Sequence, residues 1–233
     1  ACADAASKYL GIPLYKYLGG SKAFRMPTPM LNIINGGAHA NNNLSFQEFM
    51  IIPVKCKTFT ESIRKASEVF HTLKQILEKK NISTAVGDEG GFAPNLKNED
   101  QACVLIKEAI TKTGYKLGKD FFLSLDVAAS EFYTNKKYKI SSEKKLFTSD
   151  QFSDYLIKLC RKYSIISLED PFAEDDWKAW QKFNHNYGYE IQIVGDDIFT
   201  TNIDLISKGI EMKASNAVLI KVNQIGTLTE TMK

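Results

Sequence analysis

The sequence predicts an α/β protein whose strands form a barrel rather than a doubly wound sheet. From residue 121 onward, apolar runs alternate with amphipathic stretches that have a helical period. The runs are almost continuous in Ile, Leu and Val, which is typical of parallel strands buried on both faces. Each run also ends in an ionisable residue. A doubly wound sheet shares the alternation, but ionisable residues at corresponding strand ends favour a barrel, whose active site lies on that rim.

Two neighbouring strands are expected before the alternation begins. Residues 30–34 form an apolar run that ends at two glycines, and residues 46–54, with the sequence FQEFMIIPV, form the second. Because the gap between them is short, they are expected to pair as antiparallel neighbours. The first ten residues are expected to belong to a helix that is already under way.

Two helices should follow these strands. Over residues 58–80, apolar side chains recur at steps of three or four, as they do on one face of a helix. Residues 98–113 repeat this pattern, with Asn98 as the expected N-cap and Gly114 as the expected C-cap. Between the helices, the sequence NISTAVGDEGG is expected to run as a short strand into a glycine-rich loop, residues 86–95.

The second half should contain four strands, each followed by a helix or by the start of one. The expected strands are FFLSLDV, SIISLEDP, IQIVGDD and NAVLIKVNQ, and the expected helices are residues 149–163, 175–183 and 202–209. After the first strand, the sequence EFYTNKKYKI predicts a hairpin that turns at Asn135.

Composition excludes several classes of function. The chain has 233 residues, with 30 basic and 27 acidic side chains and a formal charge of +3, so nothing favours binding to nucleic acid or to a membrane surface. No apolar run is long enough to span a bilayer. The four cysteines are widely spaced, without a CxxC pair, which argues against zinc and for reduced thiols in a cytosolic protein; they are Cys2, Cys56, Cys103 and Cys160.

Both ends of the sequence suggest a piece of a longer protein. There is no initiator Met and no signal peptide, the first residues look like the later part of a helix, and GTLTETMK looks like a helix just starting. We therefore expect further sequence on both sides.

Ionisable residues gather where the last four strands end. The strands deliver Asp126, Glu169, Asp196 and Lys221 in turn, and Asp170 and Asp197 follow the second and third. A charge at the end of an apolar strand is costly unless it is paired or bound to a metal. One such residue could be a helix cap, but four in succession indicate a shared site.

Three of these residues offer only carboxylate oxygens, which suit Mg²⁺ or Mn²⁺ better than zinc or copper. We expect Asp126, Glu169 and Asp196 to hold such an ion, with Lys221 beside it. A nearby cation should lower the pKa of Lys221 toward neutrality and make it a usable general base. The alternative for Lys221 is a structural salt bridge to one of the carboxylates.

The first half adds further acidic side chains. Glu48 follows Gln47 in an apolar strand, and Glu89 follows Asp88 in the loop VGDEGGFAPN, whose glycines allow the backbone to approach a ligand closely. A metal, a lysine and separate glutamates fit removal of a proton next to a carboxylate, because a divalent cation can stabilise the dianionic enediolate. His39 lies in a loop with three asparagines and, taken alone, is more typical of an exposed histidine than of a functional one.

The chain resembles the enolase family along its whole length. The resemblance rests on seven segments in order: NIINGGAHANNNL, QEFMIIP, AVGDEGGFAPN, LDVAASEFY, SLEDPFAEDDW, VGDD and LIKVNQIGTLTET. It implies an α/β, enolase-type TIM-like barrel, ββαα(βα)₆, that is incomplete in this chain. Residues 1–233 would be a partial C-terminal barrel domain with about six of the eight strands. It also implies Mg²⁺-dependent, reversible dehydration of 2-phosphoglycerate to phosphoenolpyruvate.

The resemblance also implies a role for each matching residue. Asp126, Glu169 and Asp196 would bind Mg²⁺, Lys221 would accept the C2 proton, and Glu89 would donate a proton to the departing hydroxyl. Glu48 would support Glu89, and His39 would lie on a mobile loop that closes over the substrate. The residues expected near the substrate are His39, Gln47, Glu48, Glu169, Asp196 and Lys221.

This sequence departs from the family pattern by truncation. The small N-terminal α+β domain with its serine loop is absent from these residues, as are a substrate-binding lysine and the phosphate-binding segment. We therefore expect the 233-residue piece to be almost inactive by itself, with an unpaired sheet edge near Lys221. Members of the family are usually cytoplasmic and dimeric or larger, and they also occur at cell surfaces.

Two other interpretations are weaker. Another superfamily enzyme, related to muconate cycloisomerase or mandelate racemase, is disfavoured by GDEGG followed by LIKVNQIGT. A binding or scaffold protein is disfavoured by the intact set of Asp126, Glu169, Asp196 and Lys221, which binding alone would not need.

Overall fold

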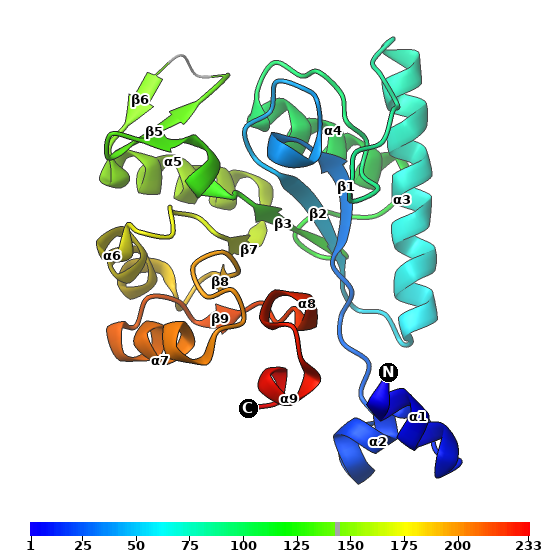
Figure 1. Cartoon of the computed structure of the whole chain (residues 1–233). Helices are drawn as coiled ribbons and strands as arrows, with labels where there is room; N and C mark the ends of the chain where they lie inside the picture. The colour runs from blue at the N-terminus through cyan, green and yellow to red at the C-terminus, as the bar shows by residue number, and fades with distance from the viewer. Residues whose placement is uncertain (143–144) are drawn as a thin grey trace.

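The structure is a computed structural model that describes residues 1–142 and 145–233. Its centre is a six-stranded sheet with the order β1-β2-β3-β7-β8-β9, curved as in an incomplete TIM-like barrel (Figure 1). The strands are β1 Leu31–Asn35, β2 Glu48–Pro53, β3 Phe121–Asp126, β7 Ile165–Glu169, β8 Gln192–Gly195 and β9 Ala217–Val218. This confirms the expected α/β barrel class.

Strand direction changes from antiparallel to parallel across the sheet. As expected, β1 pairs antiparallel with β2, and β2 also pairs antiparallel with β3. From β3 onward all pairs are parallel. The register places Glu48 opposite Asp126, and Asp126 opposite Glu169. Acidic residues from three strands therefore lie side by side at one end of the sheet.

Helices cover the outside of the sheet (Figure 1). They are α3 Phe59–Lys79, α4 Glu99–Lys112, α5 Ser149–Tyr163, α6 Trp177–Tyr187 and α7 Ile203–Met212. The side chains of Thr58 and Asn98 cap α3 and α4, and Thr148 with Gln151 forms a capping box on α5. Their apolar faces pack on the strands in one large buried core. The caps explain why these three helices begin where the sequence predicts.

The structure corrects several expected elements. Residues 81–91 form no strand and contribute only an isolated bridge, from Val86 to Phe92. The last expected strand shrinks to β9, because the Lys221 amide donates to Thr201 Oγ1 and the short helix α8 Val222–Ile225 follows at once. The chain then forms α9 Leu228–Thr231. α6 and α7 both run further than expected, to Tyr187 and Met212.

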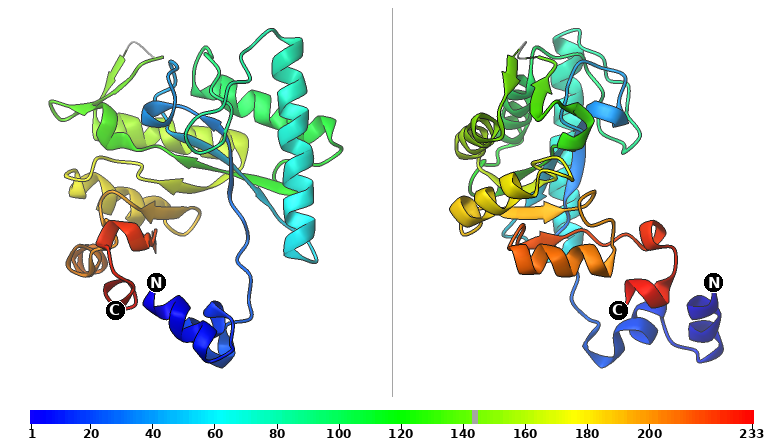
Figure 2. Two further views of the ribbon diagram at one scale, coloured as in Figure 1. Left: turned by 45° about the vertical axis from the view of Figure 1, so that its right-hand side comes forward. Right: turned by 60° about the vertical axis from the view of Figure 1, so that its left-hand side comes forward.

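Two smaller units lie outside the main sheet. A separate three-stranded sheet contains β4 Tyr133–Thr134, β5 Lys137–Ile140 and β6 Lys145–Phe147. Its first turn has positive φ at Asn135 and Lys136, which confirms the hairpin expected there. Helices α1 Cys2–Tyr9 and α2 Leu14–Gly19 form an arm joined to β1 by an extended segment, and they stand apart from the barrel in both views of Figure 2. In the part of the chain described, no helix combines the length and apolarity needed to cross a membrane.

Candidate functional site

The site is built at the end of the sheet where β3, β7 and β8 finish. Asp126 and Glu169 are the last residues of β3 and β7 and face each other in register, and Asp196 follows β8 directly. Asp126 is 3% exposed and Asp196 is 6% exposed. Parallel strands thus bring together three carboxylates that are far apart in the sequence.

Hydrogen bonds hold Asp126 and Asp170 in place. Asp126 Oδ2 accepts from Gln47 Nε2 at 2.9 Å, and its Oδ1 accepts from the amide of Ala128 at 3.0 Å. Asp170 has a positive φ of 41°, which turns its carboxylate toward the end of β8. There it accepts from the amides of Asp196 at 3.1 Å and Asp197 at 2.8 Å. Asp170 therefore fixes the backbone that carries Asp196.

Lys221 is paired with a carboxylate. Its Nζ lies 2.5 Å from Asp196 Oδ2, and Asp196 Oδ1 accepts from Gln224 Nε2 at 2.7 Å. Burial alone would lower the pKa of Lys221, but the hydrogen bond to Asp196 and the charges of Glu169 and Asp126 outweigh it and raise that pKa. The expected fall toward neutrality depends on a bound cation and stays a prediction, because without the ion the lysine faces carboxylates.

Burial and mutual repulsion disfavour the charged forms of Asp126, Glu169 and Asp170. Burial is the main cause that raises the pKa of Asp126 and of Glu169, and repulsion from neighbouring carboxylates adds to it. Burial also raises the pKa of Asp170, from 3.8 to about 7. Among the described residues, Lys221 is the only cation that forms an ion pair with Asp126, Glu169, Asp170 or Asp196, and its partner is Asp196. Such an excess of buried negative charge fits a divalent cation.

As possible metal ligands, Asp126, Glu169, Asp170 and Asp196 offer only carboxylate oxygen atoms, which also fits a hard ion such as Mg²⁺. Ligand atoms of Asp170, Asp196 and Asp197 lie within 4.8 Å of one another. Within the described residues, Asp126, Glu169 and Asp196 do not meet this criterion as a set of three. Their assignment as the metal ligands therefore stays a prediction, and Asp170 and Asp197 are further carboxylates that the sequence placed nearby without a role.

A second group faces the same rim from the first half of the chain. Ligand atoms of His39, Glu48 and Glu89 lie within 4.8 Å of one another, and His39 Nδ1 is 3.3 Å from Glu48 Oε1. Burial raises the pKa of Glu48, and Glu89 raises it further, while His39 and Lys221 act in the opposite direction. Glu48 therefore interacts electrostatically with residues of both groups, Glu89 and Lys221.

Two loops are tied together to position His39 and Glu89. The amide of Asp88 donates to the carbonyl of His39 at 3.0 Å. The amide of Gly91 donates to Oδ1 of Asn35, a fully buried residue at the end of β1, at 2.9 Å. At Gly87 an added Cβ would lie 2.6 Å from the carbonyl oxygen of His39, so only glycine fits there. The loop 86–95 is thus seated on the sheet rather than free.

All the sequence-predicted site residues lie at this end of the sheet, and their roles stay predictions. His71 and His185, which were assigned no role, lie on the outer helices α3 and α6. No sequence pattern predicted a role for Gln224 or Thr201. Gln224 bonds to Asp196, and Thr201 Oγ1 accepts from the Lys221 amide at 2.9 Å. The only available signal was the short spacing between Lys221 and Gln224.

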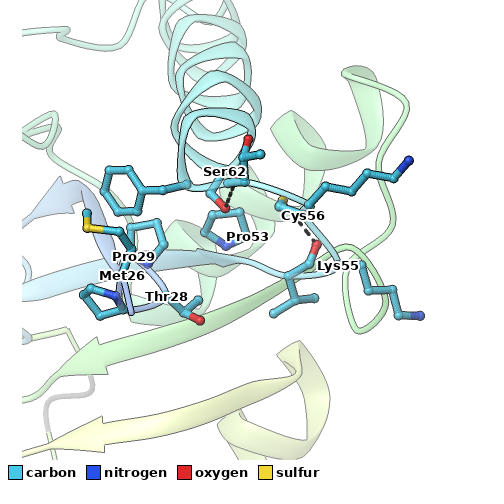
Figure 3. Close-up of a pocket in the computed structure, with 12 residues that line it drawn as sticks. Met26, Thr28, Pro29, Pro53, Lys55, Cys56 and Ser62 are labelled. Carbon is cyan, nitrogen blue, oxygen red and sulfur yellow. Dashed lines mark hydrogen bonds between the residues drawn. The ribbon is translucent and has the colours of Figure 1, made fainter. Parts of the chain in front are cut away.

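A cavity of about 340 Å³ lies elsewhere, beyond the opposite end of β2 from Glu48 (Figure 3). It is lined by residues 26–29, residues 53–59 and Ser62. The N-terminus of α3 at its wall is already capped by Thr58, and Glu61 accepts from the amide of Lys57. The cavity is therefore separate from the acidic rim and shares none of its residues.

One comparison with known proteins bears on this site. The model of a family described as "Enolase, C-terminal TIM barrel domain" matches residues 23–233. The match contains all six strands of the main sheet and the acidic residues at its end, Asp126, Glu169, Asp170, Asp196 and Asp197. The arm of α1 and α2 precedes the matched residues.

Proposed function

The chain belongs to the enolase family through its C-terminal TIM barrel domain, and we propose that its site serves the Mg²⁺-dependent, reversible dehydration of 2-phosphoglycerate to phosphoenolpyruvate. The observation that carries this proposal is that Glu48, which has a carboxylate oxygen within 4.8 Å of one of Glu89, lies in register opposite Asp126 at the end of the sheet where Lys221 pairs with Asp196. A lysine and an acid are thereby held at one end of the sheet, together with a cluster of buried carboxylates.

Lys221 is the proposed base that removes the C2 proton. Its backbone is fixed by Thr201, and its amine is held at the rim by Asp196. In the proposed reaction, the amine must give up a proton before it can accept one from C2. Bound Mg²⁺ would supply positive charge that favours the neutral amine and the negative charge that develops on the substrate. The residues proposed to hold Mg²⁺ are Asp126, Glu169 and Asp196.

Glu89 is the proposed acid that protonates the departing hydroxyl group. It is exposed at the tip of the seated loop, so it can reach a substrate that enters from solvent. Glu48 lies beside it on a strand, with a carboxylate oxygen within 4.8 Å of one of Glu89. Gln47 donates to Asp126 and orients that carboxylate. His39 is proposed to contact the substrate from the loop tied to Asp88.

The rest of the proposal concerns the whole protein. β9 forms one edge of the sheet beside Lys221, and we propose that further strands complete the barrel there. We also propose a cytoplasmic homodimer or larger homo-oligomer, on the basis of the family resemblance. A chain of these 233 residues alone should form little phosphoenolpyruvate.

The test is the reaction itself, measured on the complete product of the gene. Phosphoenolpyruvate should form from 2-phosphoglycerate with Mg²⁺ and should stop forming when a chelator removes the ion. If the pure protein produces no phosphoenolpyruvate with Mg²⁺ present, the proposed activity is wrong. Mg²⁺-dependent thermal stabilisation that Asp196→Asn abolishes would show whether a metal site exists even then.

A further inference from the structure

We propose that a cavity between α4 and α5 binds a small amphipathic carboxylate, a molecule with one anionic head and an apolar body. The cavity has a volume of about 660 Å³, which lies within the usual range for small-molecule sites. It is lined by one face of α4 between Val104 and Lys112, and by Lys162 and Tyr163 at the end of α5. α5 leads into the start of β7, whereas Glu169 is the last residue of β7, so the cavity is separate from the acidic end of the sheet.

The wall that α4 contributes suits an apolar body. Val104, Lys107 and Thr111 follow one another at steps of three and four residues, so they share one face of the helix. Val104 is 45% exposed on this face. Lysine side chains cover apolar surface with their methylene stems while their amines stay in water, and Lys107 and Lys112 flank the face in this way. From Val104 to Lys112 the helix rises about 12 Å, so a short extended chain can lie along it.

The charges of the cavity favour an anionic head. Glu108 is the single acid among the lining residues, and its carboxylate is already shared by Lys112 at 2.7 Å and Lys80 at 3.5 Å. In the part of the chain that the structure describes, the exposed amine of Lys107 forms no ion pair. A carboxylate that enters the cavity therefore meets a free ammonium group and little competing negative charge.

A buried hydroxyl group supplies the specific contact. Tyr163 is 2% exposed, and its hydroxyl oxygen is buried with no hydrogen-bond partner among the described residues. Leaving such a group unsatisfied is unfavourable, so a ligand oxygen that accepts its proton in a hydrogen bond gains affinity. Burial raises the pKa of Tyr163, so the phenol stays protonated at neutral pH and remains a donor.

Lys162 controls access to this hydroxyl group. Its Nζ lies 5.0 Å from the centre of the Tyr163 ring and 2.6 Å from Asp100 of α4. The Lys162 side chain is 59% exposed, so it can move off the ring at little cost and then pair with the entering carboxylate. The head of the ligand would thus be held between Lys162 and Tyr163, and its body would lie along Val104.

Binding of sodium octanoate to the complete protein tests the site, with 1-octanol as the uncharged ligand of the same length. Titration calorimetry should show one octanoate site, and octanol should bind at least about tenfold more weakly. Octanol that binds as tightly as octanoate would overturn the proposal, because it would show that no anion is recognised. Absence of octanoate binding would overturn it as well.

Tyr163→Phe removes only the hydroxyl group and should weaken octanoate binding about tenfold, because a hydrogen bond to a charged group is lost. The variant should be at least as stable as the unaltered protein, since the lost group had no partner in the fold. The matched control is Tyr189→Phe, at a tyrosine that is 82% exposed and outside the cavity. It should leave octanoate affinity unchanged, and equal affinity in Tyr163→Phe and Tyr189→Phe would overturn the proposal.

Val104→Glu tests the place of binding at an exposed position that tolerates the change. A new carboxylate on this face would pair with Lys107 and repel the octanoate head, so binding should fall at least about tenfold. In NMR spectra of the unaltered protein, octanoate should shift the amide signals of Val104 and Tyr163 but not that of Tyr189. Octanoate binding that Val104→Glu leaves unchanged would contradict the assigned cavity. None of these measurements depends on whether the protein forms phosphoenolpyruvate.

Discussion

Lys221 and Asp196 form an ion pair, with Lys221 Nζ 2.5 Å from Asp196 Oδ2. A ring of contacts fixes this pair. The Lys221 amide donates to Thr201 Oγ1, the Thr201 hydroxyl donates to Gln224 Oε1 at 2.9 Å, and Gln224 Nε2 donates to Asp196 Oδ1. The pair satisfies the structural alternative for Lys221, but it also holds the amine at the rim where a base is needed.

Substitution of Lys221 and of Glu89 should affect different steps of the proposed reaction. Lys221→Ala removes the base, so exchange of the C2 proton of 2-phosphoglycerate with solvent deuterium should fall by about 10²–10⁴-fold. Glu89→Gln retains the base, so exchange should continue while phosphoenolpyruvate formation falls by a similar factor. Both are measured by NMR on the complete protein with Mg²⁺. Exchange that persists in Lys221→Ala would assign the base to another residue.

The stability of the metal-free chain should fall as pH rises. Asp170 has a pKa of about 7 in the fold against an ordinary 3.8, so the folded chain binds this proton more tightly than the unfolded chain. Its stabilising effect is complete below about pH 4 and is lost as pH rises through about 7. Burial raises the pKa of Asp126 and of Glu169 as well, so they act in the same direction. Mg²⁺ should restore the lost stability above pH 7.

Thermal melting across this pH range, with and without Mg²⁺, measures the effect. Asp126→Asn removes one buried charge and should reduce both the pH dependence and the Mg²⁺ response. Asp154→Asn, on the exposed surface of α5, is the matched control and should change neither. Stability that increases from pH 4 to 7 in the absence of metal would contradict the assigned direction.

The sequence predicted the elements that depend on local chemistry or on continuous burial. α5 begins as expected because Thr148 and Gln151 cap it through contacts three residues apart, and it ends as expected at Tyr163, where Ser164 adopts a left-handed conformation. β3, β7 and β8 were evident because most of their residues are buried. The strand expected at residues 81–91 fails because loop 86–95 instead makes its hydrogen bonds with β1 and with the His39 loop.

Site residues were predictable as a set, but their contacts were not. Strand ends brought Asp126, Glu169 and Asp196 to one rim by topology alone. Asp170 accepts hydrogen bonds from the amides after β8 because its left-handed backbone conformation directs its carboxylate there. No sequence pattern specifies that direction. The sign of the Lys221 pKa shift depends on a partner 25 residues away. Roles for His39 and Glu89 came from the family resemblance rather than from the residues alone.

Of the four thiols, two should react readily and two should be protected by burial. All four cysteines are free; Cys103 and Cys160 are buried, whereas Cys2 is exposed and Cys56 is partly exposed. Burial raises the pKa of Cys103 and raises that of Cys160 to about 12, so neither forms the nucleophilic thiolate near neutral pH. Ellman's reagent should therefore react quickly with two thiols in the native chain and with all four after unfolding. Mass spectrometry should locate the quick reaction at Cys2 and Cys56, and early labelling of Cys103 would show that α4 does not pack as described.

Gly87 and Gly90 should respond differently to alanine, although both lie in the loop 86–95. At Gly87 the new methyl group would lie 2.6 Å from the carbonyl oxygen of His39 and 2.8 Å from Cβ of Asn35, so the two loops must separate. At Gly90 the methyl group would meet nothing within 4 Å, and only the positive φ of 81° opposes it. Gly87→Ala should therefore destabilise the chain by about 1–3 kcal/mol through overpacking, and Gly90→Ala by about 1 kcal/mol through backbone strain.

Urea unfolding compares the stabilities of the two variants. Hydrogen exchange at the Asp88 amide locates the structural change, because that amide donates to the His39 carbonyl and should lose protection in Gly87→Ala alone. Equal loss of protection in both variants would mean that backbone conformation, rather than the close approach of Gly87 to His39, seats the loop.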